Sequence, residues 1–303
     1  MKENRISAPD LLALNPRELP GRARDFSRYS FWQYTRLSTA DLILNTSCFR
    51  VSSLREMNDL DEARAHQQEE AQIYALCFCN SNTEKIPMWY LYSGLAGDGA
   101  ALGLTPAKML QFIRSIQTVR GVCGGQRKEE GDLLRVGAEV ELRFGWVYYC
   151  KSRERDQVWY RNKWYTVEDA DAFRQDNCFL KAYPWEYERE FRLVFRNRTD
   201  RDYNALFVDI PPQVQRDMKV MLAPELHEGK LAQGFACIGR THTPRPSELS
   251  IRMNLFSRHR GGLLEYLREE LARECPEIDA AAVCRAVQQA RRCGYCADGA
   301  DTE

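Results

Sequence analysis

Short apolar runs separated by polar turns fill most of the chain between residues 31 and 222. Residues 73–79 are apolar throughout, which is typical of a strand buried on both faces of a sheet. Aromatic and β-branched residues indicate further strands. These predicted strands are 31–35, 48–52, 100–104, 139–149, 158–160, 164–167, 191–195, 205–210 and 219–222. So many short strands, with helices between them, predict an α+β fold.

Helical patterns are fewer and shorter than the strand patterns. They occur at 39–44, 61–72, 106–118 and 168–181. Ser38 is placed to cap the first helix, with Leu42 and Ile43 facing inward. Pro106 suits the first position of the third helix, because a helix needs no backbone donor there. The glycine-rich residues 121–125 then predict a surface loop.

Composition shifts along the chain predict three parts. Residues 1–29 are rich in Pro, Arg and Leu and are expected to form an N-terminal arm. Residues 30–243 carry the strands and their flanking helices and form the main body. Prolines at 244–246 mark a boundary, and residues 247–303 contain two amphipathic patterns that predict a small helical C-terminal appendage.

Charge and composition show that any attraction of nucleic acid or anionic membrane must be local. Lys plus Arg equals Asp plus Glu at 43 each, so the 303-residue chain has no overall field that attracts nucleic acid or anionic membrane. No run approaches the length of a membrane span, and the first residues lead into no apolar signal core. We therefore expect a cytoplasmic protein without a membrane partner. In that reducing compartment most of the eleven cysteines should be buried free thiols.

The segment before the 191–195 strand carries the most unusual charge pattern. Alternate residues of a strand share a face, so Glu188, Glu190 and Arg192 are predicted to project on one side. Two carboxylates two residues apart repel each other, and at least one should have a raised pKa unless a cation compensates them. This arrangement is costly in plain architecture and useful in an active site.

Three motifs in a fixed order carry a family resemblance. They are Asn58-Asp59-Leu60-Asp61-Glu62, Met88-Trp89-Tyr90-Leu91-Tyr92, and Trp185-Glu186-Tyr187-Glu188-Arg189-Glu190-Phe191-Arg192. Over roughly residues 30–240 the chain resembles a bacterial domain-of-unknown-function family with Asn-Asp-Pro-Phe-Glu, Met-Trp-x-x-Tyr and Trp-x-x-Glu-x-Glu-Tyr-Arg signatures. The first motif departs from that pattern, because Leu60 and Asp61 stand where Pro and Phe are common.

That family is in turn similar to ADP-ribosyltransferases, which implies a split β-sheet body and NAD as the substrate. Their last motif is Glu-x-Glu at the start of an apolar strand, and its second Glu is catalytic. Glu188-Arg189-Glu190 matches this motif. Their first strand often contains His-x-Thr, which Gln33-Tyr34-Thr35 matches in part, with Gln33 in the place of the histidine. An amide can still hydrogen-bond a ribose hydroxyl.

The resemblance assigns roles to individual residues. Glu190 would stabilise the positive charge that develops on the ribose, and Glu188 would orient or deprotonate the acceptor. An aromatic ring would stack on nicotinamide, for which Tyr34, Trp89 and Tyr92 are candidates. Arg36 and Arg192 are candidates for holding the pyrophosphate or the glutamates. Asn58, Asp59 and Glu62 would fix the loop beside the site.

Plainer interpretations of the same residues stay open. Glu188 and Glu190 are also compatible with a solvated strand face paired with neighbouring arginines. Trp89 and Tyr92 share one helix face, as core-packing residues do. Asn58 and Asp59 are common in turns and caps.

Two further segments have a functional and a structural interpretation. Trp159, Arg161, Lys163 and Trp164 interleave rings and cations, as a surface for a nucleic-acid acceptor does, but the favoured interpretation is a β-hairpin with cross-strand aromatic pairs. Four cysteines near the C-terminus could bind zinc or line the inner faces of two helices. They are Cys275, Cys284, Cys293 and Cys296.

Three functions follow from these patterns. The first is an NAD-consuming ADP-ribosyltransferase, such as a bacterial toxin or antiphage effector, that modifies a protein or a nucleic acid. The second is a metal-dependent nuclease with Asp59, Glu62 and Glu190 as ligands, although no histidine pair at ligand spacing supports a metal site. The third is a non-enzymatic binding module that uses the aromatic-basic hairpin and the C-terminal helices.

Overall fold

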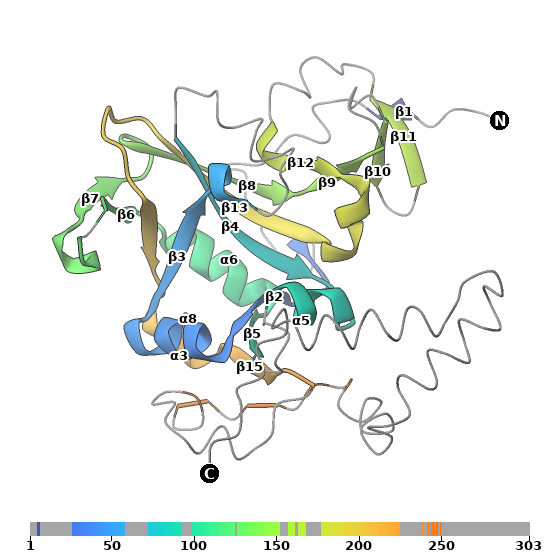
Figure 1. Cartoon of the computed structure of the whole chain (residues 1–303), viewed down its shortest axis with the longest axis horizontal. Helices are drawn as coiled ribbons and strands as arrows, with labels where there is room; N and C mark the ends of the chain where they lie inside the picture. The colour runs from blue at the N-terminus through green and yellow to red at the C-terminus, as the bar shows by residue number, and fades with distance from the viewer. Residues whose placement is uncertain are drawn as a thin grey trace, which may run out of the picture. The chain divides into compact units, whose positions relative to one another are not determined.

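A computed structural model describes residues 5–6, 26–57, 72–92, 99–124, 126–151, 157–160, 163–167 and 177–224, together with single positions between 238 and 249. The chain divides into two units, Met1–Ser247 and Glu248–Glu303, and every helix and strand named below lies in the first (Figure 1). Residues 61–71 of the helix predicted at 61–72, the C-terminal cysteines and most of the N-terminal arm lie outside the described residues. No helix in the described part is long and apolar enough to cross a membrane.

A ten-stranded antiparallel sheet is the larger of two sheets in the described residues. Its strands are β2 (Phe31–Arg36), β3 (Cys48–Ser53), β4 (Ile73–Asn80), β5 (Gly99–Leu104), β6 (Thr118–Val122), β7 (Asp132–Arg135), β8 (Val140–Trp146), β13 (Glu190–Asn197), β14 (Ala205–Asp209) and β15 (Lys219–Leu222). With the helices between these strands, the architecture confirms the α+β prediction.

Strand β4 organises this sheet because it has two different neighbours on one edge. Along the other edge it pairs with β13 over its whole length, and β13 pairs with β8. The start of β2 pairs at Asn80 and Cys79, whereas the end of β3 pairs at Ala75 and Tyr74. The sheet therefore splits beside β4. One branch continues through β2, β5 and β15, and the other through β3, β14, β6 and β7.

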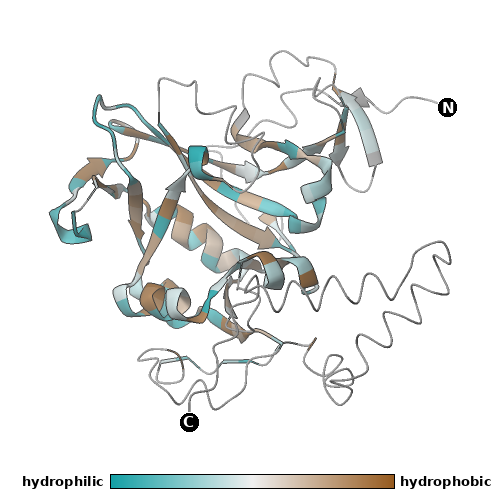
Figure 2. Cartoon of the chain, viewed as in Figure 1, coloured by the Kyte–Doolittle hydropathy of each residue, from teal (hydrophilic) through white to brown (hydrophobic). Residues whose placement is uncertain are grey.

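The main core lies on one face of this sheet. Phe191 of β13 is fully buried and contacts the rings of Phe26, Phe31 and Trp146 at centroid distances of 5.4, 4.9 and 5.2 Å. Helix α6 (Pro106–Ser115) covers the same core through Met109, Leu110, Phe112 and Ile113. Figure 2 shows the hydrophobic positions of α6 and of the central strands beside it.

A second, five-stranded sheet is built from the strands between β8 and β13, with β1 added at one edge. Its strands are β1 (Arg5–Ile6), β9 (Tyr148–Cys150), β10 (Gln157–Tyr160), β11 (Lys163–Val167) and β12 (Leu180–Ala182). This sheet has a small core of its own, formed by Tyr148, Cys150, Val158, Val167 and Leu180. The predicted hairpin at 158–167 is present, with Trp159 opposite Trp164.

Short helices connect the strands. They are α3 (Leu37–Thr46), α5 (Ile86–Tyr92), α8 (Pro212–Arg216) and the 3-10 helices η2 (Leu54–Glu56), η3 (Lys128–Glu130), η4 (Asn177–Phe179) and η5 (Tyr183–Glu188). Helix α3 links the two branches of the split sheet, since it leads directly from β2 into β3. Helix α5 contacts β2.

Several local predictions are wrong. The single strand expected at 139–149 is interrupted at Val147, where the backbone N–H turns to bond the carbonyl of Glu190 at 2.9 Å. The end of the helix expected at 168–181 is instead η4 followed by β12. The third predicted helix ends at Ser115, and Gly121 lies inside β6, where a side chain would collide with the ring of Tyr203.

Helix α3 also differs from its prediction. It begins at Leu37, and Arg36 at its N-cap makes no side-chain capping bond, so Ser38 is not the cap. Leu42 is 59% exposed, because the inward face of the helix is formed by Leu37, Ala40, Ile43 and Leu44. Their spacing of three, three and one residues is that of a helical face.

The position of Phe191 in the main core gives a first test. Phe191→Ala should lower the free energy of unfolding by about 3–5 kcal/mol, because it removes a ring from a closely packed aromatic cluster. Leu133→Ala, at a residue that is 59% exposed, should change it by less than about 0.5 kcal/mol. Urea unfolding followed by circular dichroism measures both. Equal losses in the two variants would contradict this assignment of the core.

Candidate functional site

A buried ion pair forms where β13 begins. Glu190 and Arg192 project from the face opposite Phe191, as the alternation predicts. Arg192 donates from Nε to Oε1 of Glu190 at 2.7 Å and from Nη2 to Oε2 at 2.9 Å. Arg192 is fully buried and Glu190 is 5% exposed. The solvated-face interpretation of these residues is therefore wrong.

Glu188 joins this pair from a different element than the sequence predicts. It is the last residue of η5, and β13 starts only at Glu190. Arg189 between them has a φ of 44°, in the left-handed region, which ends the helix and turns the chain into the strand. The prediction that Glu188 lies on the strand is thus wrong, but the helix end still brings its carboxylate to Glu190.

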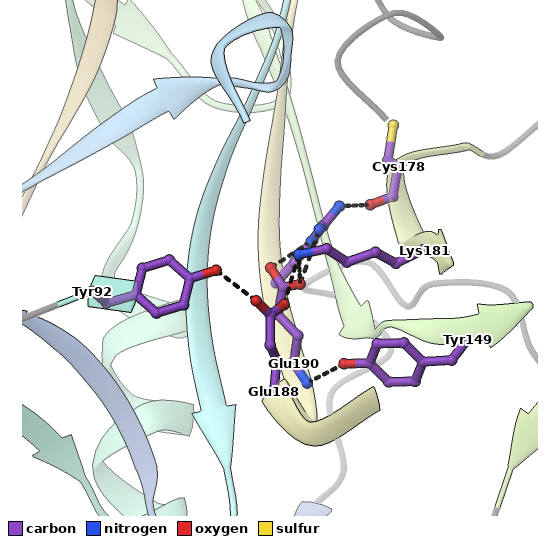
Figure 3. Close-up of polar contacts among 7 residues, drawn as sticks. Tyr92, Tyr149, Cys178, Lys181, Glu188 and Glu190 are labelled. Atoms are coloured by element: carbon purple, nitrogen blue, oxygen red, sulfur yellow. Dashed lines mark hydrogen bonds and ion pairs between the residues drawn. The ribbon is translucent and has the colours of Figure 1, made fainter. Parts of the chain in front are cut away.

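Lys181 is the residue that holds the two carboxylates together. Its ammonium lies 2.6 Å from Oε2 of Glu188 and 3.6 Å from Oε2 of Glu190 (Figure 3). The same Nζ lies 4.6 Å from the ring centre of Trp185, a cation–π contact. None of the sequence motifs includes Lys181. A lysine inside the apolar run 178–182 was a usable signal, because a buried ammonium requires an acidic partner.

Backbone contacts tie the same residues to the second sheet. The N–H of Glu190 donates to the hydroxyl of Tyr149 on β9 at 2.8 Å. Nη1 of Arg192 donates to the carbonyl of Cys178 at 2.8 Å. With the bond from Val147 to the carbonyl of Glu190 and the ion pair of Lys181 on β12, the start of β13 is joined to β9, η4 and β12. The charged cluster is consequently a junction between the two sheets.

The surroundings move the pKa values of the two carboxyl groups in opposite directions. Burial raises the pKa of Glu188, and the charge of Glu190 raises it further. Lys181 and Tyr92 lower this pKa, but their effect is smaller, so the net shift is upward. Burial also acts to raise the pKa of Glu190, but Arg192 and Lys181 outweigh it and lower that pKa to about 2. Glu190 therefore stays ionised, whereas Glu188 is the member of the pair that takes up a proton more readily.

Helix α5 brings aromatic residues to the cluster. The hydroxyl of Tyr92 donates to Oε1 of Glu188 at 2.5 Å, from the side opposite Lys181 (Figure 3). Trp89 packs edge-on against Tyr34 at a centroid distance of 4.7 Å and donates from Nε1 to Glu84 at 3.0 Å. Trp89 is 4% exposed and Tyr34 6%. Trp89 and Tyr34 thus pack as core residues, and Tyr92 reaches the acids.

Strand register decides which residues of β2 face the cluster. Trp32 lies opposite Cys79, which lies opposite Glu190. Directly paired residues share a face, so Trp32, Tyr34 and Arg36 are on the side of Glu190. Arg36 is exposed at the end of the strand. It remains available to an anionic ligand.

Gln33 and Thr35 are on the other face of β2, with the main core. Gln33 pairs with Leu102, a core residue, and its Oε1 is buried with no hydrogen-bond partner among the described residues. The structure therefore does not bring Gln33 or Thr35 to Glu190. Counting alternate positions from Tyr34, which faces α5, would have shown that the two flanking residues point away.

The metal-site and loop predictions depend on residues that lie largely beyond the described ranges. Asn58, Asp59 and Glu62 are outside them. Within them, no group of three or more His, Cys, Asp or Glu side chains is arranged to hold a metal ion. Both oxygens of Glu190 are bonded by Arg192, so a metal at Glu190 would have to displace a guanidinium.

Comparison of the chain with protein-family models, with curated proteins and with solved structures finds no match. The family resemblance accordingly stays an expectation from its motifs. What the fold and the site define is an α+β protein with a split antiparallel sheet and a buried cluster of two acids and two bases. Any assignment of function has to follow from the geometry of that cluster.

The charged junction predicts a strong effect of Glu190→Gln on stability. Near neutral pH this change should lower the free energy of unfolding by about 3–5 kcal/mol, because Arg192 and Lys181 lose their shared carboxylate inside the protein. The native pKa of Glu190, about 2, lies below its ordinary value of 4.5. The stabilisation is therefore complete above about pH 4.5 and is lost as the pH falls toward 2, so the two proteins should converge in acid.

Urea unfolding at a series of pH values measures this difference. Glu141→Gln is the matched control, since Glu141 pairs with Arg198 at 2.8 Å on the surface. That variant should lose no more than about 1 kcal/mol. A loss in Glu190→Gln as small as in the control would show that the buried pair does not hold the junction.

Proposed function

We propose that this protein is an NAD-dependent ADP-ribosyltransferase, of the kind found among bacterial toxins and antiphage effectors. One observation carries the proposal: the bond from Tyr92 to Glu188 joins the Met-Trp-x-x-Tyr helix to the Glu-x-Glu segment. Residues far apart in the sequence thus place a ring and two carboxylates at one point. The split of the sheet beside β4 agrees with the fold that the motif resemblance implies.

The proposed reaction moves ADP-ribose from NAD to a nucleophilic nitrogen or oxygen of an acceptor. The bond between the ribose C1′ and the nicotinamide nitrogen breaks, and neutral nicotinamide leaves with the electron pair. A new bond forms between C1′ and the acceptor, which gives up a proton. Positive charge develops on the ribose in between, so a fixed negative charge lowers the barrier.

The opposite pKa shifts suggest how the two acids divide this work. Glu190 remains ionised through its pairing with Arg192 and Lys181, and supplies the fixed negative charge. Glu188 has a raised pKa and receives the proton of the acceptor. Two neighbouring carboxyls with divergent pKa values are the usual basis for such a division of roles. Lys181 acts as a positioning residue for both.

The remaining substrate contacts are assigned to the candidate residues that are not already enclosed by other side chains. Tyr92 is the ring that we assign to nicotinamide, because Trp89 and Tyr34 are buried against each other. Arg36 is assigned to the pyrophosphate, since Arg192 is enclosed by its bonds to Glu190 and Cys178. Gln33 and Thr35 have no role in this version of the site.

Burial sets a requirement on substrate entry. Glu188 is 2% exposed, and the hydroxyl of Tyr92 occupies its Oε1. NAD must therefore displace Tyr92 from Glu188 when it binds. A ring that first covers the acid and then stacks on the substrate would link NAD binding to exposure of the base.

The Tyr92–Glu188 contact gives the test of this function. Wild-type protein incubated with NAD should release nicotinamide, and Glu188→Gln should reduce the rate about 10²–10⁴-fold, the usual contribution of a general base. The hydrogen bond from Tyr92 lowers the pKa of Glu188. Tyr92→Phe should consequently move the acid limb of the rate profile to higher pH, because the base then stays protonated to a higher pH.

Tyr90→Phe on the same helix is the control, since Tyr90 is 46% exposed, and its profile should match that of the wild type. Thermal unfolding of each variant establishes that it is folded. No nicotinamide release by the wild type, or an unchanged rate in folded Glu188→Gln, would reject the proposed function.

A further inference from the structure

Three aromatic rings meet on one face of the second sheet, beside the helix that leads to Glu188. Trp159 of β10, Trp164 of β11 and Tyr183 at the start of η5 contact one another at centroid distances of 5.2, 5.7 and 4.9 Å. Lys151 lies over the ring of Trp164 at 5.8 Å. We call these three rings the aromatic surface. It draws on three elements that are separate in the sequence.

The small core of the second sheet does not account for these rings. Val158 and Val167 belong to that core, and successive residues of a strand point to opposite faces. Trp159 therefore lies on the face away from Val158. Tyr183 is 38% exposed, and both tryptophans are partly exposed. Each of the three aromatic residues is therefore partly exposed to solvent.

The charge composition of this part of the sequence favours an anionic ligand, and Lys151 brings one cation to the rings themselves. Residues 151–163 contain five basic and two acidic residues in a chain whose net charge is zero. The basic ones are Lys151, Arg153, Arg155, Arg161 and Lys163. Rings that stack on bases, set among cations that meet phosphates, are the features of sites for single-stranded nucleic acid.

We propose that the aromatic surface binds single-stranded nucleic acid and presents it as the acceptor of ADP-ribose. Helix η5 begins at Tyr183 and ends at Glu188, which at about 2 Å per residue places the two ends roughly 10 Å apart along the helix. A strand stacked on Tyr183 thus has a neighbouring base within reach of the charged cluster. The acceptor role rests on the proposed function, whereas the binding does not.

Fluorescence anisotropy with labelled single-stranded oligo-dT and oligo-U tests the binding with the full chain. Tyr183→Ala should weaken it about 5- to 150-fold, the range for loss of one stacked base. Lys151→Ala should reduce the slope of log K against log salt by about 0.7, which corresponds to one phosphate contact. Tyr29→Ala is the matched control, because Tyr29 is 39% exposed on a separate segment, and it should bind as the wild type does.

No binding of either oligonucleotide, or equal affinities of folded Tyr183→Ala and Tyr29→Ala, would overturn the proposal. Preference for oligo-dT or for oligo-U identifies DNA or RNA as the ligand. With NAD present, label on the oligonucleotide supports the acceptor role, and label confined to protein rejects it. Nicotinamide release without oligonucleotide binding would reject the nucleic-acid site and leave the proposed function intact. Oligonucleotide binding without nicotinamide release would reject the proposed function and support the nucleic-acid site.

Discussion

The shared contact of Lys181 with Glu188 and Glu190 is the interaction on which the rest of the site depends. Two carboxylates that are buried side by side would repel each other strongly, since the protein interior screens charge far less than water does. Arg192 alone satisfies only Glu190, and it does so with two parallel hydrogen bonds. Lys181 allows Glu188 to remain beside it, so that two acids and two bases occupy one buried volume. Truncating any of the four would leave an uncompensated charge inside the protein.

This cluster also joins the two sheets, which creates a conflict between stability and the catalysis that we propose. The start of β13 is bonded to Tyr149 and Val147, and Arg192 is bonded to the carbonyl of Cys178. A carboxylate that is needed for the junction cannot be removed without disturbing the fold. Glu188 is less constrained in this respect, because it ends a short helix and contacts Tyr92 on α5. A loss of activity on changing Glu190 would thus report on folding and on chemistry together, whereas Tyr92, which carries no charge in the cluster, separates the two.

The split of the large sheet explains why α5 reaches the acids at all. Beside β4, the strands β2 and β3 share one edge and then diverge, and the face of β2 that carries Tyr34 is the face of Glu190. Helix α5 packs on that face through Trp89 and thereby places Tyr92 over Glu188. On the other side of the cluster, η5 leads from the aromatic surface to the same carboxylate. The proposed NAD and nucleic-acid sites therefore meet at Glu188.

Local sequence pattern was enough to predict the α+β class and the buried strand β4. It also predicted the paired tryptophans of the hairpin and the alternation of Glu190 and Arg192. Each of these features depends on residues close together in the chain. The sequence also indicated that at least one of two neighbouring acids would have a raised pKa unless a cation compensated them. It did not identify Lys181 as that cation, the break at Val147 or the face of Gln33, since these depend on strand register and on bonds between distant segments. Only the tertiary structure decided which side chains meet. The physical reason is that burying a charge is tolerable only beside a partner, and that partner can come from anywhere in the chain.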